Sequence, residues 1–288
     1  VLDRNGLRPS IYYITKDGFL VLSSEVGCID IPAEDVVVKE RLRPGKMLLV
    51  DTVKGKLIDD EDIKEYYSTR QPYGEWLDQN LVHLGDLKIP NKGIEKYDKE
   101  SLVRHQKAFG YTYEQIRTSI LPMAKNGTEP IAAMGADTAI PPLSQKDGPL
   151  FNYFKQLFAQ VTNPPFDSIR EEIVTDTSVH LGSNGNILEE KPENCHILKI
   201  EDPILTNTDL LKIKNIDAPG LKSAVIPITY YKSTNLAKAI EHLFILADKA
   251  YKDGANIIIL SDRGVDEYHV AIPSLLAVSA MHQQLVRT

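Results

Sequence analysis

The stretch that decides the fold is "SAVIPITYYKSTNLAKAIEHLFILADKAYKDGANIIILSD", residues 223–262. Residues 223–228 are a short apolar run typical of a buried strand, and residues 256–262 are a second one. Between them, apolar residues recur at helical spacing, and Gly254 follows as a helix stop. The stripe consists of Leu236, Ala239, Ile240, Leu243, Phe244, Ala247, Ala250 and Tyr251. Strand, helix and strand at this spacing predict two parallel strands joined by a right-handed crossover.

The residues on either side extend the same pattern. "PSLLAVSAMHQQLVR", residues 273–287, predicts a helix opened by Pro273. "PLFNYFKQLFAQV", residues 149–161, predicts another helix from its apolar spacing. After Pro164-Pro165, a short acidic helix should start at Asp167 or Ser168. We therefore predict an α/β domain over residues 101–288.

The N-terminal part has a different character. Residues 11–22 predict a β-hairpin around Lys16-Asp17-Gly18, and further strands follow up to residue 58. Two short helices with acidic starts follow from Asp59, and residues 85–100 are polar with Pro and Gly. We predict a β-rich part over residues 1–77, a linker over 78–100 and the α/β domain after it. A hairpin alone is marginal in water, so it needs further strands as partners.

Composition narrows the function classes. Of 288 residues, 42% are hydrophobic and 25% charged, which are globular values. The formal charge of -7 argues against a nucleic-acid partner. No apolar run approaches the length of a membrane span, and no leader precedes the hairpin. We expect a cytoplasmic protein that does not bind membranes.

The cysteines and histidines do not form a metal-binding pattern. Cys28 and Cys195 are the two cysteines, they are far apart, and neither belongs to a CxxC motif. We interpret them as buried thiols. The seven histidines are scattered without ligand spacing. We expect no metal site in this chain.

One loop carries candidate functional residues on position alone. Ser261, Asp262 and Arg263 follow the strand of residues 256–262 and should emerge at its carboxyl end. Ligands bind at that end of parallel α/β sheets. The competing interpretation is that an Asp262–Arg263 ion pair closes the loop.

Two other polar motifs favour structural interpretations. Asp3, Arg4 and Arg8 surround Asn5-Gly6 and could bind an anion, but a turn braced by these charges is the better interpretation. "GSNGN", residues 182–186, is a turn without the context of a phosphate loop. Nothing in the chain forms a set of nucleophile, base and orienting group.

Eight motifs in one order resemble the large chain of glutamate synthases. They are "LDRNGLRPSIYYIT", "SSEVG", "RLRPGKMLLVD", "HQKAFGYTYEQI", "PMAKNGTEPIAAMGADT", "YFKQLFAQVTNPPFDSIREE", "ILSDRGVD" and "IPSLLAVSAMHQQLVRT". The resemblance spans essentially all of the chain. It implies the end of a class II glutaminase domain, a β-rich remnant of an N-terminal-nucleophile sandwich, followed by a rudimentary barrel-like α/β central domain.

The resemblance also implies what this segment does not contain. The family's glutaminase uses an N-terminal Cys as nucleophile, whereas the first residue here is Val1 and Cys28 lies inside the segment. FMN and an iron–sulfur cluster belong to the parent chain and are not expected here. We expect this segment alone neither to hydrolyse glutamine nor to reduce 2-oxoglutarate.

Two loops carry residues that the resemblance connects with the family's chemistry. Thr162, Asn163 and Pro164 match the loop that lines the ammonia tunnel. Met134, Gly135 and Asp137 match the loop that reaches toward the 2-oxoglutarate pocket. Ala136 stands where the family commonly has Asn, and the surroundings of His282 depart from a His-rich version, so neither receives a role.

The resemblance also defines partners and alternatives. The partners are the glutaminase and FMN-barrel domains of the same chain and an electron donor, ferredoxin or a nicotinamide-dependent subunit. Association into a homo-oligomer through unpaired strand edges stays open. One alternative is a purely structural docking module. Another is an independent phosphate-binding α/β enzyme that uses the loop of Ser261, and it ranks last because no Gly-rich phosphate loop accompanies the strand.

Overall fold

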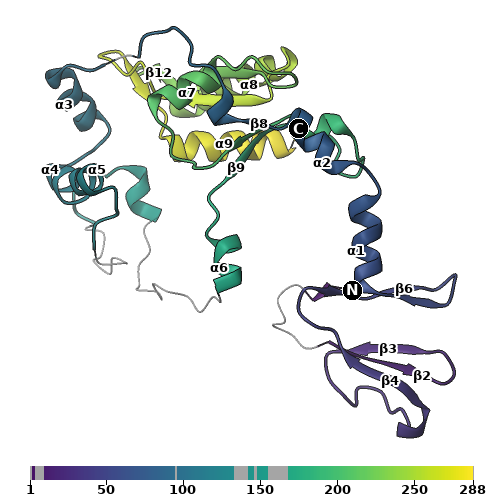
Figure 1. Ribbon diagram of the computed structural model, residues 1–288. Coiled ribbons are helices and arrows are strands. Elements are labelled where there is room, and N and C mark those ends of the chain that lie inside the picture. Colours follow the sequence, from purple (N-terminus) through teal and green to yellow (C-terminus); the bar gives the residue numbers. More distant parts are fainter. Residues whose placement is uncertain are drawn as a thin grey trace. The chain divides into compact units, whose positions relative to one another are not determined.

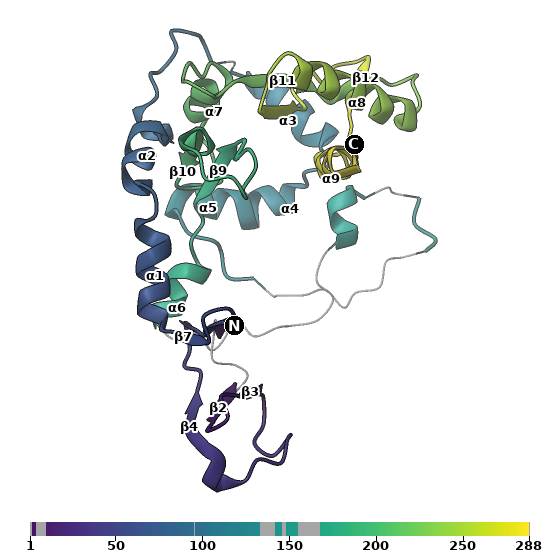
Figure 2. The same ribbon diagram turned by 90° about the vertical axis from the view of Figure 1, so that its right-hand side faces the viewer.

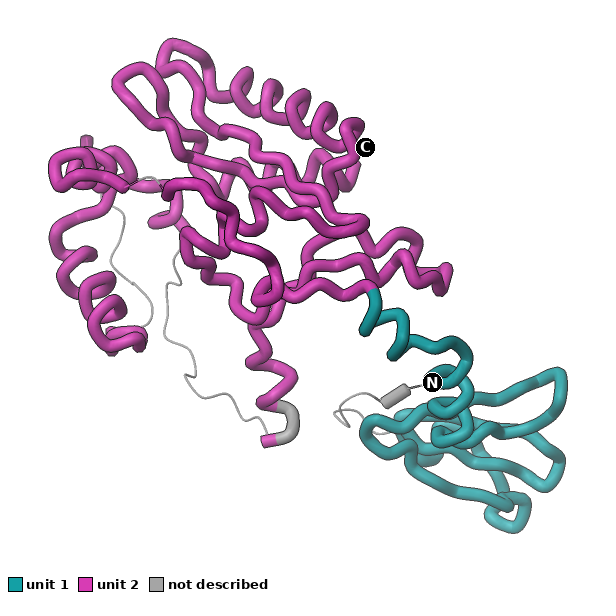
Figure 3. Tube along the Cα trace, turned by 45° about the horizontal axis from the view of Figure 1, so that its top comes forward, with its two compact units in different colours: residues 1–79 teal, residues 80–288 magenta. Residues whose placement is uncertain are grey.

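The computed structural model describes residues 2–3, 10–94, 96–132, 142–145, 148–154 and 168–287. The chain forms two compact units, residues 1–79 and residues 80–288, which Figure 3 distinguishes by colour.

The first unit is built on a three-stranded antiparallel sheet in the order β3-β2-β4 (Figure 1). These strands are β2 (Ile11–Thr15), β3 (Leu20–Ser23) and β4 (Val36–Arg41). The predicted hairpin is confirmed, with Tyr12 opposite Leu22 and Tyr13 opposite Val21. Gly18 takes a φ of 81° in the connecting turn, a conformation that suits glycine. One face of the sheet buries Tyr12 against Leu42 and Leu48.

Smaller elements complete the first unit. The hairpin of β6 and β7 and the two helices after it agree with the sequence prediction. The bounds are β1 (Leu2–Asp3), η1 (Ala33–Asp35), β5 (Lys46–Met47), β6 (Leu49–Asp51), β7 (Lys56–Ile58), α1 (Asp60–Thr69) and α2 (Tyr73–Asn80). Strands β1 and β5 pair antiparallel.

The second unit contains the predicted strand–helix–strand motif. Strands β11 (Ser223–Pro227) and β13 (Ile257–Ser261) are parallel and joined through α8 (Leu236–Lys252). The Asn235 side chain caps α8 by accepting a hydrogen bond from the Ala237 N–H at 2.8 Å. The main core and the residues packed against it include six of the eight predicted stripe residues of α8, namely Ala239, Ile240, Leu243, Phe244, Ala247 and Ala250. The two end residues, Leu236 and Tyr251, are 37% and 71% exposed, so the prediction is confirmed for the middle of the stripe and wrong for its ends.

The other strands pair mostly antiparallel, so the unit is not a purely parallel sheet. Strand β10 (Ile197–Ile200) lies between β8 (Val82–His83), which is parallel to it, and β9 (Val179–Gly182), which is antiparallel. Strands β12 and β14 form an antiparallel pair, and their bounds are Thr229–Tyr231 and His269–Ala271. A mixed α/β architecture results.

Helices surround these strands. Helix α9 (Ser274–Arg287) starts after Pro273 as predicted and shares a core with α8 (Figures 1 and 2). Residues 150–154 of the predicted helix over 149–161 form a 3-10 helix, η4, and residues 155–161 lie outside the described residues. The remaining bounds are η2 (Leu84–Asp86), α3 (Lys99–Ala108), α4 (Tyr113–Gln115), η3 (Ile116–Ile120), α5 (Leu121–Asn126), α6 (Ser168–Val174), η5 (Pro192–Cys195) and α7 (Asn207–Lys214).

The predicted linker, residues 78–100, lies almost entirely in the second unit, which begins at residue 80. Strand β8 and η2 fall within it, and Lys92 Nζ donates a hydrogen bond to Asn215 Oδ1 just after α7. Gly93 and Ile94 line a small cavity together with residues of the same helix. Searching the described residues for a helix with the length and apolarity of a membrane span finds none.

Candidate functional site

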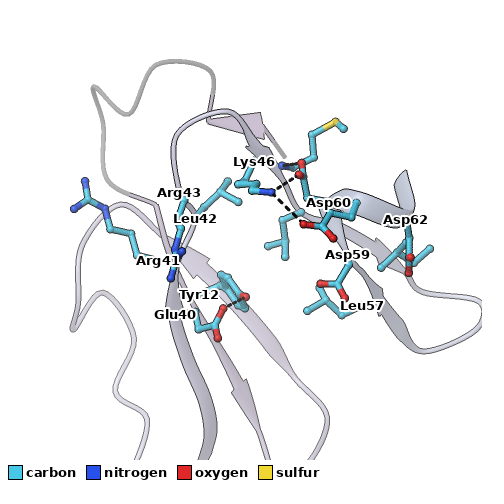
Figure 4. Close-up of a pocket in the computed structure, with 14 residues that line it drawn as sticks. Tyr12, Glu40, Arg41, Leu42, Arg43, Lys46, Leu57, Asp59, Asp60 and Asp62 are labelled. Carbon is cyan, nitrogen blue, oxygen red and sulfur yellow. Dashed lines mark hydrogen bonds and ion pairs between the residues drawn. The ribbon is translucent and has the colours of Figure 1, made fainter. Parts of the chain in front are cut away.

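A cavity of about 400 Å³ in the first unit is lined by several ionisable side chains (Figure 4). Asp60 is only 9% exposed and accepts hydrogen bonds from Lys46 Nζ at 2.8 Å and from the Met47 N–H at 2.9 Å. Lys64 Nζ lies 2.9 Å from the same carboxylate. The hydrogen bond from Lys46 is the largest cause that holds the pKa of Asp60 well below its usual range. Asp60 therefore stays charged at neutral pH.

Tyr12 is a further ionisable group of this cavity with a shifted pKa. Its hydroxyl donates a hydrogen bond to Glu40 Oε2 at 2.7 Å. Burial, and then the bond and charge of Glu40, raise the pKa of Tyr12 to about 12. Neither shift moves its group toward neutral pH, where a general acid or base is most effective. These contacts stabilise the fold.

Cys28 lies on a surface turn of the first unit. It is exposed, whereas Cys195 is partly buried, so the expectation of two buried thiols is wrong. The reason is local, because Gly27 takes a φ of 86° in the turn and the Cys28 thiol donates only to the Glu25 carbonyl oxygen, at 3.3 Å. Within the described residues, no three His, Cys, Asp or Glu side chains gather into a potential metal site.

The loop after β13 in the second unit holds the three residues that sequence position singled out. The Ser261 carbonyl accepts a hydrogen bond from the Ile228 N–H at 2.9 Å, which ties the end of β13 to the neighbouring chain. The Arg263 N–H lies 3.4 Å from Ser261 Oγ. Arg263 Nη2 donates to Asn207 Oδ1 at 2.8 Å, so its guanidinium is held against α7. The loop thus emerges at the carboxyl end of a parallel strand, as predicted.

Arg263 lines a small cavity of about 200 Å³. The other lining residues come from one face of α7 and from the segment before α3. They are Gly93, Ile94, Asn207, Leu210, Leu211 and Lys214. Arg263 and Lys214 are the cationic residues of this lining, so the cavity suits a small anion such as a carboxylate or phosphate.

Asp262 lines a different cavity, of about 440 Å³. Its lining combines three aromatic residues, Phe109, Tyr111 and Phe151, with short polar side chains. The other members are Gly110, Gln115, Pro149, Asn152 and Ser274. Within the described residues, Asp262 has no hydrogen bond or ion pair, and Arg263 is engaged elsewhere. The proposed Asp262–Arg263 ion pair is therefore wrong.

Comparison with known proteins identifies the family. Residues 104–288 match the model of the glutamate synthase central domain, and residues 1–76 match glutamine amidotransferases class-II. This chain belongs to the glutamate synthase family. The large chain of glutamate synthase [NADPH] from Bacillus subtilis is 45% identical over 287 residues, which cover 100% of this chain and 19% of that protein.

Two further glutamate synthases give the same result. Glutamate synthase [NADH] from Schizosaccharomyces pombe is 41% identical over 299 residues, covering 99% of this chain and 14% of that protein. Ferredoxin-dependent glutamate synthase 2 from Synechocystis is 39% identical over 292 residues, covering 99% of this chain and 18% of that protein. The chain spans less than a fifth of the length of these relatives.

In this member of the glutamate synthase family, the structure brings together only some of the site residues that the sequence predicted. Ser261, Asp262 and Arg263 form one loop, but Asp262 and Arg263 line separate cavities. The six residues taken from the two family loops lie outside the described residues. They are Met134, Gly135, Asp137, Thr162, Asn163 and Pro164. The aromatic lining next to Asp262 was missed, although Phe109 and Tyr111 stand within "HQKAFGYTYEQI", a motif quoted only for its resemblance.

Proposed function

We propose that this chain is the segment of a glutamate synthase that connects the glutaminase reaction with the flavin reaction. The observation that carries the proposal is the succession of two family models in one chain, together with 45% identity to a glutamate synthase large chain over 287 residues. We assign residues 1–77 to the end of the glutaminase domain, 78–100 to a linker and 101–288 to a barrel-like central domain.

The parent enzyme would make L-glutamate from 2-oxoglutarate and the ammonia released from glutamine. FMN and an iron–sulfur cluster would lie in other domains of that chain. Curated relatives are described as NADPH-, NADH- or ferredoxin-dependent, so the electron donor is either a nicotinamide-dependent partner or ferredoxin. We expect the parent to be cytoplasmic. Within this segment we assign no catalytic residue.

Two loops would carry the connecting role. Thr162, Asn163 and Pro164 would line the passage for ammonia, because a rigid backbone and short side chains suit a narrow route that excludes water. Met134, Gly135 and Asp137 would reach the 2-oxoglutarate side. These assignments come from the family resemblance of "QVTNPP" and "MGADT".

The test measures how the two reactions are coupled in the full-length enzyme. We would substitute Thr162→Val and Asn163→Leu and compare glutamine hydrolysed with glutamate formed. A lining role predicts that glutaminase turnover continues while free ammonia appears and glutamate formation falls. Ser233→Ala, an exposed position in the loop before α8, serves as the matched control.

The outcome separates a conduit from a docking module. Unchanged coupling in both variants would contradict the lining role. A parallel fall of both activities together with loss of the folded enzyme would instead indicate that the loop is only structural.

We also propose that this segment lacks glutaminase activity by itself. Cys28 is exposed and its thiol contacts only a backbone carbonyl among the described residues, so no base is placed to activate it. An assay for glutamate release from glutamine should give no turnover above the blank. Turnover that disappears in Cys28→Ala would refute this.

A second candidate function is supported by the cavity at Arg263. Its two cationic residues would bind a phosphate or carboxylate at the end of β13. Calorimetric titration with inorganic phosphate and with a nucleotide tests this candidate. Binding that is lost in Arg263→Met would favour this candidate. If neither phosphate nor the nucleotide gives a heat of binding, the candidate is rejected.

A further inference from the structure

We propose that the cavity beside Asp262 binds a small organic ammonium group, either a primary amine or a quaternary ammonium. The proposal is independent of the connecting role, because none of the lining residues belongs to the two family loops. It rests on the charge of one carboxylate, the aromatic residues around it and the packing that supports them.

The carboxylate supplies an unbalanced negative charge. Asp262 is partly buried, and within the described residues no donor bonds to it. Its sequence neighbour Arg263 is held by Asn207 on α7 and lines a different cavity. A partly buried carboxylate that has no bonded partner among the described residues is available to pair with a cationic ligand.

The aromatic residues supply the other half of the recognition. Phe109, Tyr111 and Phe151 line the same cavity and are 38%, 51% and 51% exposed. Each of the three therefore keeps aromatic surface that a ligand in the cavity can reach. The faces of such rings attract ammonium groups, and aromatic cages with a carboxylate are the usual site for them.

Packing holds the aromatic residues in place. Gly110 takes a φ of 76°, and a Cβ there would lie 2.7 Å from Pro149 Cγ, so the turns that carry Tyr111 and Phe151 are in direct contact. The Tyr111 N–H donates to the Gln106 carbonyl at 2.9 Å, which fixes the first turn on α3. The Asn152 N–H donates to the Pro149 carbonyl at 2.9 Å and fixes the second. The backbone of both turns is therefore fixed at the points that carry Tyr111 and Phe151.

The lining also excludes other classes of ligand. Among the described residues, the lining contains no Lys, Arg or His, so an anion would meet the negative charge of Asp262 without a cation to balance it. In the described part of the lining Asp262 is the one carboxylate, which is too few hard oxygen ligands for a divalent metal ion. The volume of about 440 Å³ has room for a ligand of several heavy atoms. Gln115 and Asn152 can accept the N–H bonds of a primary amine.

Equilibrium dialysis of the full-length polypeptide against radiolabelled tetramethylammonium tests the proposal. We expect saturable binding that unlabelled methylammonium displaces and sodium at the same concentration does not. Asp262→Asn should weaken binding about tenfold or more, because it removes the negative charge that pairs with the ammonium group. Tyr111→Leu should weaken it as well, whereas Tyr111→Phe keeps the ring face and should bind like the parent protein.

Asp248→Asn is the matched control, because it removes the same charge from an exposed position on α8. If it weakens binding as much as Asp262→Asn, the probe only responds to net charge and the proposal fails. Absence of saturable binding, or equal affinity of the Tyr111→Leu and Tyr111→Phe variants, also overturns it. If Asp262→Asn does not fold, as judged by circular dichroism, the comparison of the two Tyr111 variants decides.

Discussion

Lys46 Nζ lies 2.8 Å from Asp60 Oδ2, and this contact ties β5 to the first residue of α1. The Met47 N–H donates to the other oxygen of the same carboxylate at 2.9 Å. Lys64, one turn further along α1, approaches it at 2.9 Å. The nearly buried Asp60 carboxylate therefore accepts a hydrogen bond from a strand N–H and pairs with two ammonium groups.

Asp60 should make the first unit sensitive to acid. Its folded pKa is held below that of an unfolded carboxyl group, first by the hydrogen bond from Lys46. The stabilisation is therefore complete above the unfolded pKa of about 4 and is lost as the pH falls below it. We expect Asp60→Asn to lower the midpoint temperature of unfolding at pH 7. As the pH falls below 5, the midpoint of this variant should decrease less than that of the parent protein. Thermal unfolding followed by Trp76 fluorescence measures both effects.

Asp62→Asn provides the comparison for this prediction. Asp62 lies in the same first turn of α1 but is exposed. Its substitution should leave the acid dependence of unfolding unchanged. An equal effect of the two substitutions would mean that the contact between β5 and α1 contributes nothing beyond the favourable charge at the helix start.

Tyr12 should lose its proton at a higher pH than an ordinary phenol. Burial, assisted by Glu40, raises its pKa to about 12, so the folded state retains a proton that the unfolded state loses near pH 10. The stability from this bond is present below pH 10 and is lost as the pH rises through about 12. Absorbance titration at 295 nm should show a late step that disappears in Tyr12→Phe. The step should persist in Tyr66→Phe, since Tyr66 is 61% exposed.

Local patterns predicted the elements better than they predicted the contacts between them. The crossover of β11, α8 and β13 could be predicted because apolar spacing distinguishes strand from helix, and the structure places these stripes in one core. The role of Asp60 could not be predicted from sequence. An acidic residue at a helix start is equally explained by the helix dipole, and its partner Lys46 lies fourteen residues earlier, on β5.

The candidate site shows the same limit. Position at a strand end correctly predicted that Ser261, Asp262 and Arg263 form a loop at the end of β13. Which neighbour each side chain would meet depends on α7 and on the turn of Tyr111, which are distant in sequence. Adjacent opposite charges suggested an ion pair, but Asn207 takes the guanidinium of Arg263 and leaves Asp262 to the aromatic cavity.

Leu243 should be a main contributor to the stability of the second unit. It is 2% exposed and lies in one core with Ile228, Ala277 and Met281. Leu243→Ala should cost about 2–5 kcal/mol of unfolding free energy, since it removes buried methyl groups and leaves a cavity. Ile245→Ala on the exposed face of α8 should change it by only about 0.5 kcal/mol. Urea denaturation followed by circular dichroism measures the unfolding free energy of both variants, and hydrogen exchange in β13 shows whether the loss lies in the second unit.

Gly220 should not tolerate a side chain. Its φ is 73°, and a Cβ there would lie 2.7 Å from His196 Cβ and Nδ1. His196 Nε2 is 2.7 Å from Asn80 Oδ1, so the ring cannot move away without losing that hydrogen bond. We expect Gly220→Ala to cost about 1–2 kcal/mol from the left-handed backbone alone, and more from the clash. Thermal unfolding of the second unit measures the loss.

A double-mutant cycle separates the two causes of this loss. In a His196→Gly background both the Cβ and the ring are absent, so Gly220→Ala should cost only the backbone part. Gly85→Ala is the control, because Gly85 has no positive φ and its added Cβ would meet nothing within 4 Å. If Gly220→Ala costs the same with and without the His196 side chain, the close approach is not a constraint, and the glycine is required for its backbone conformation alone.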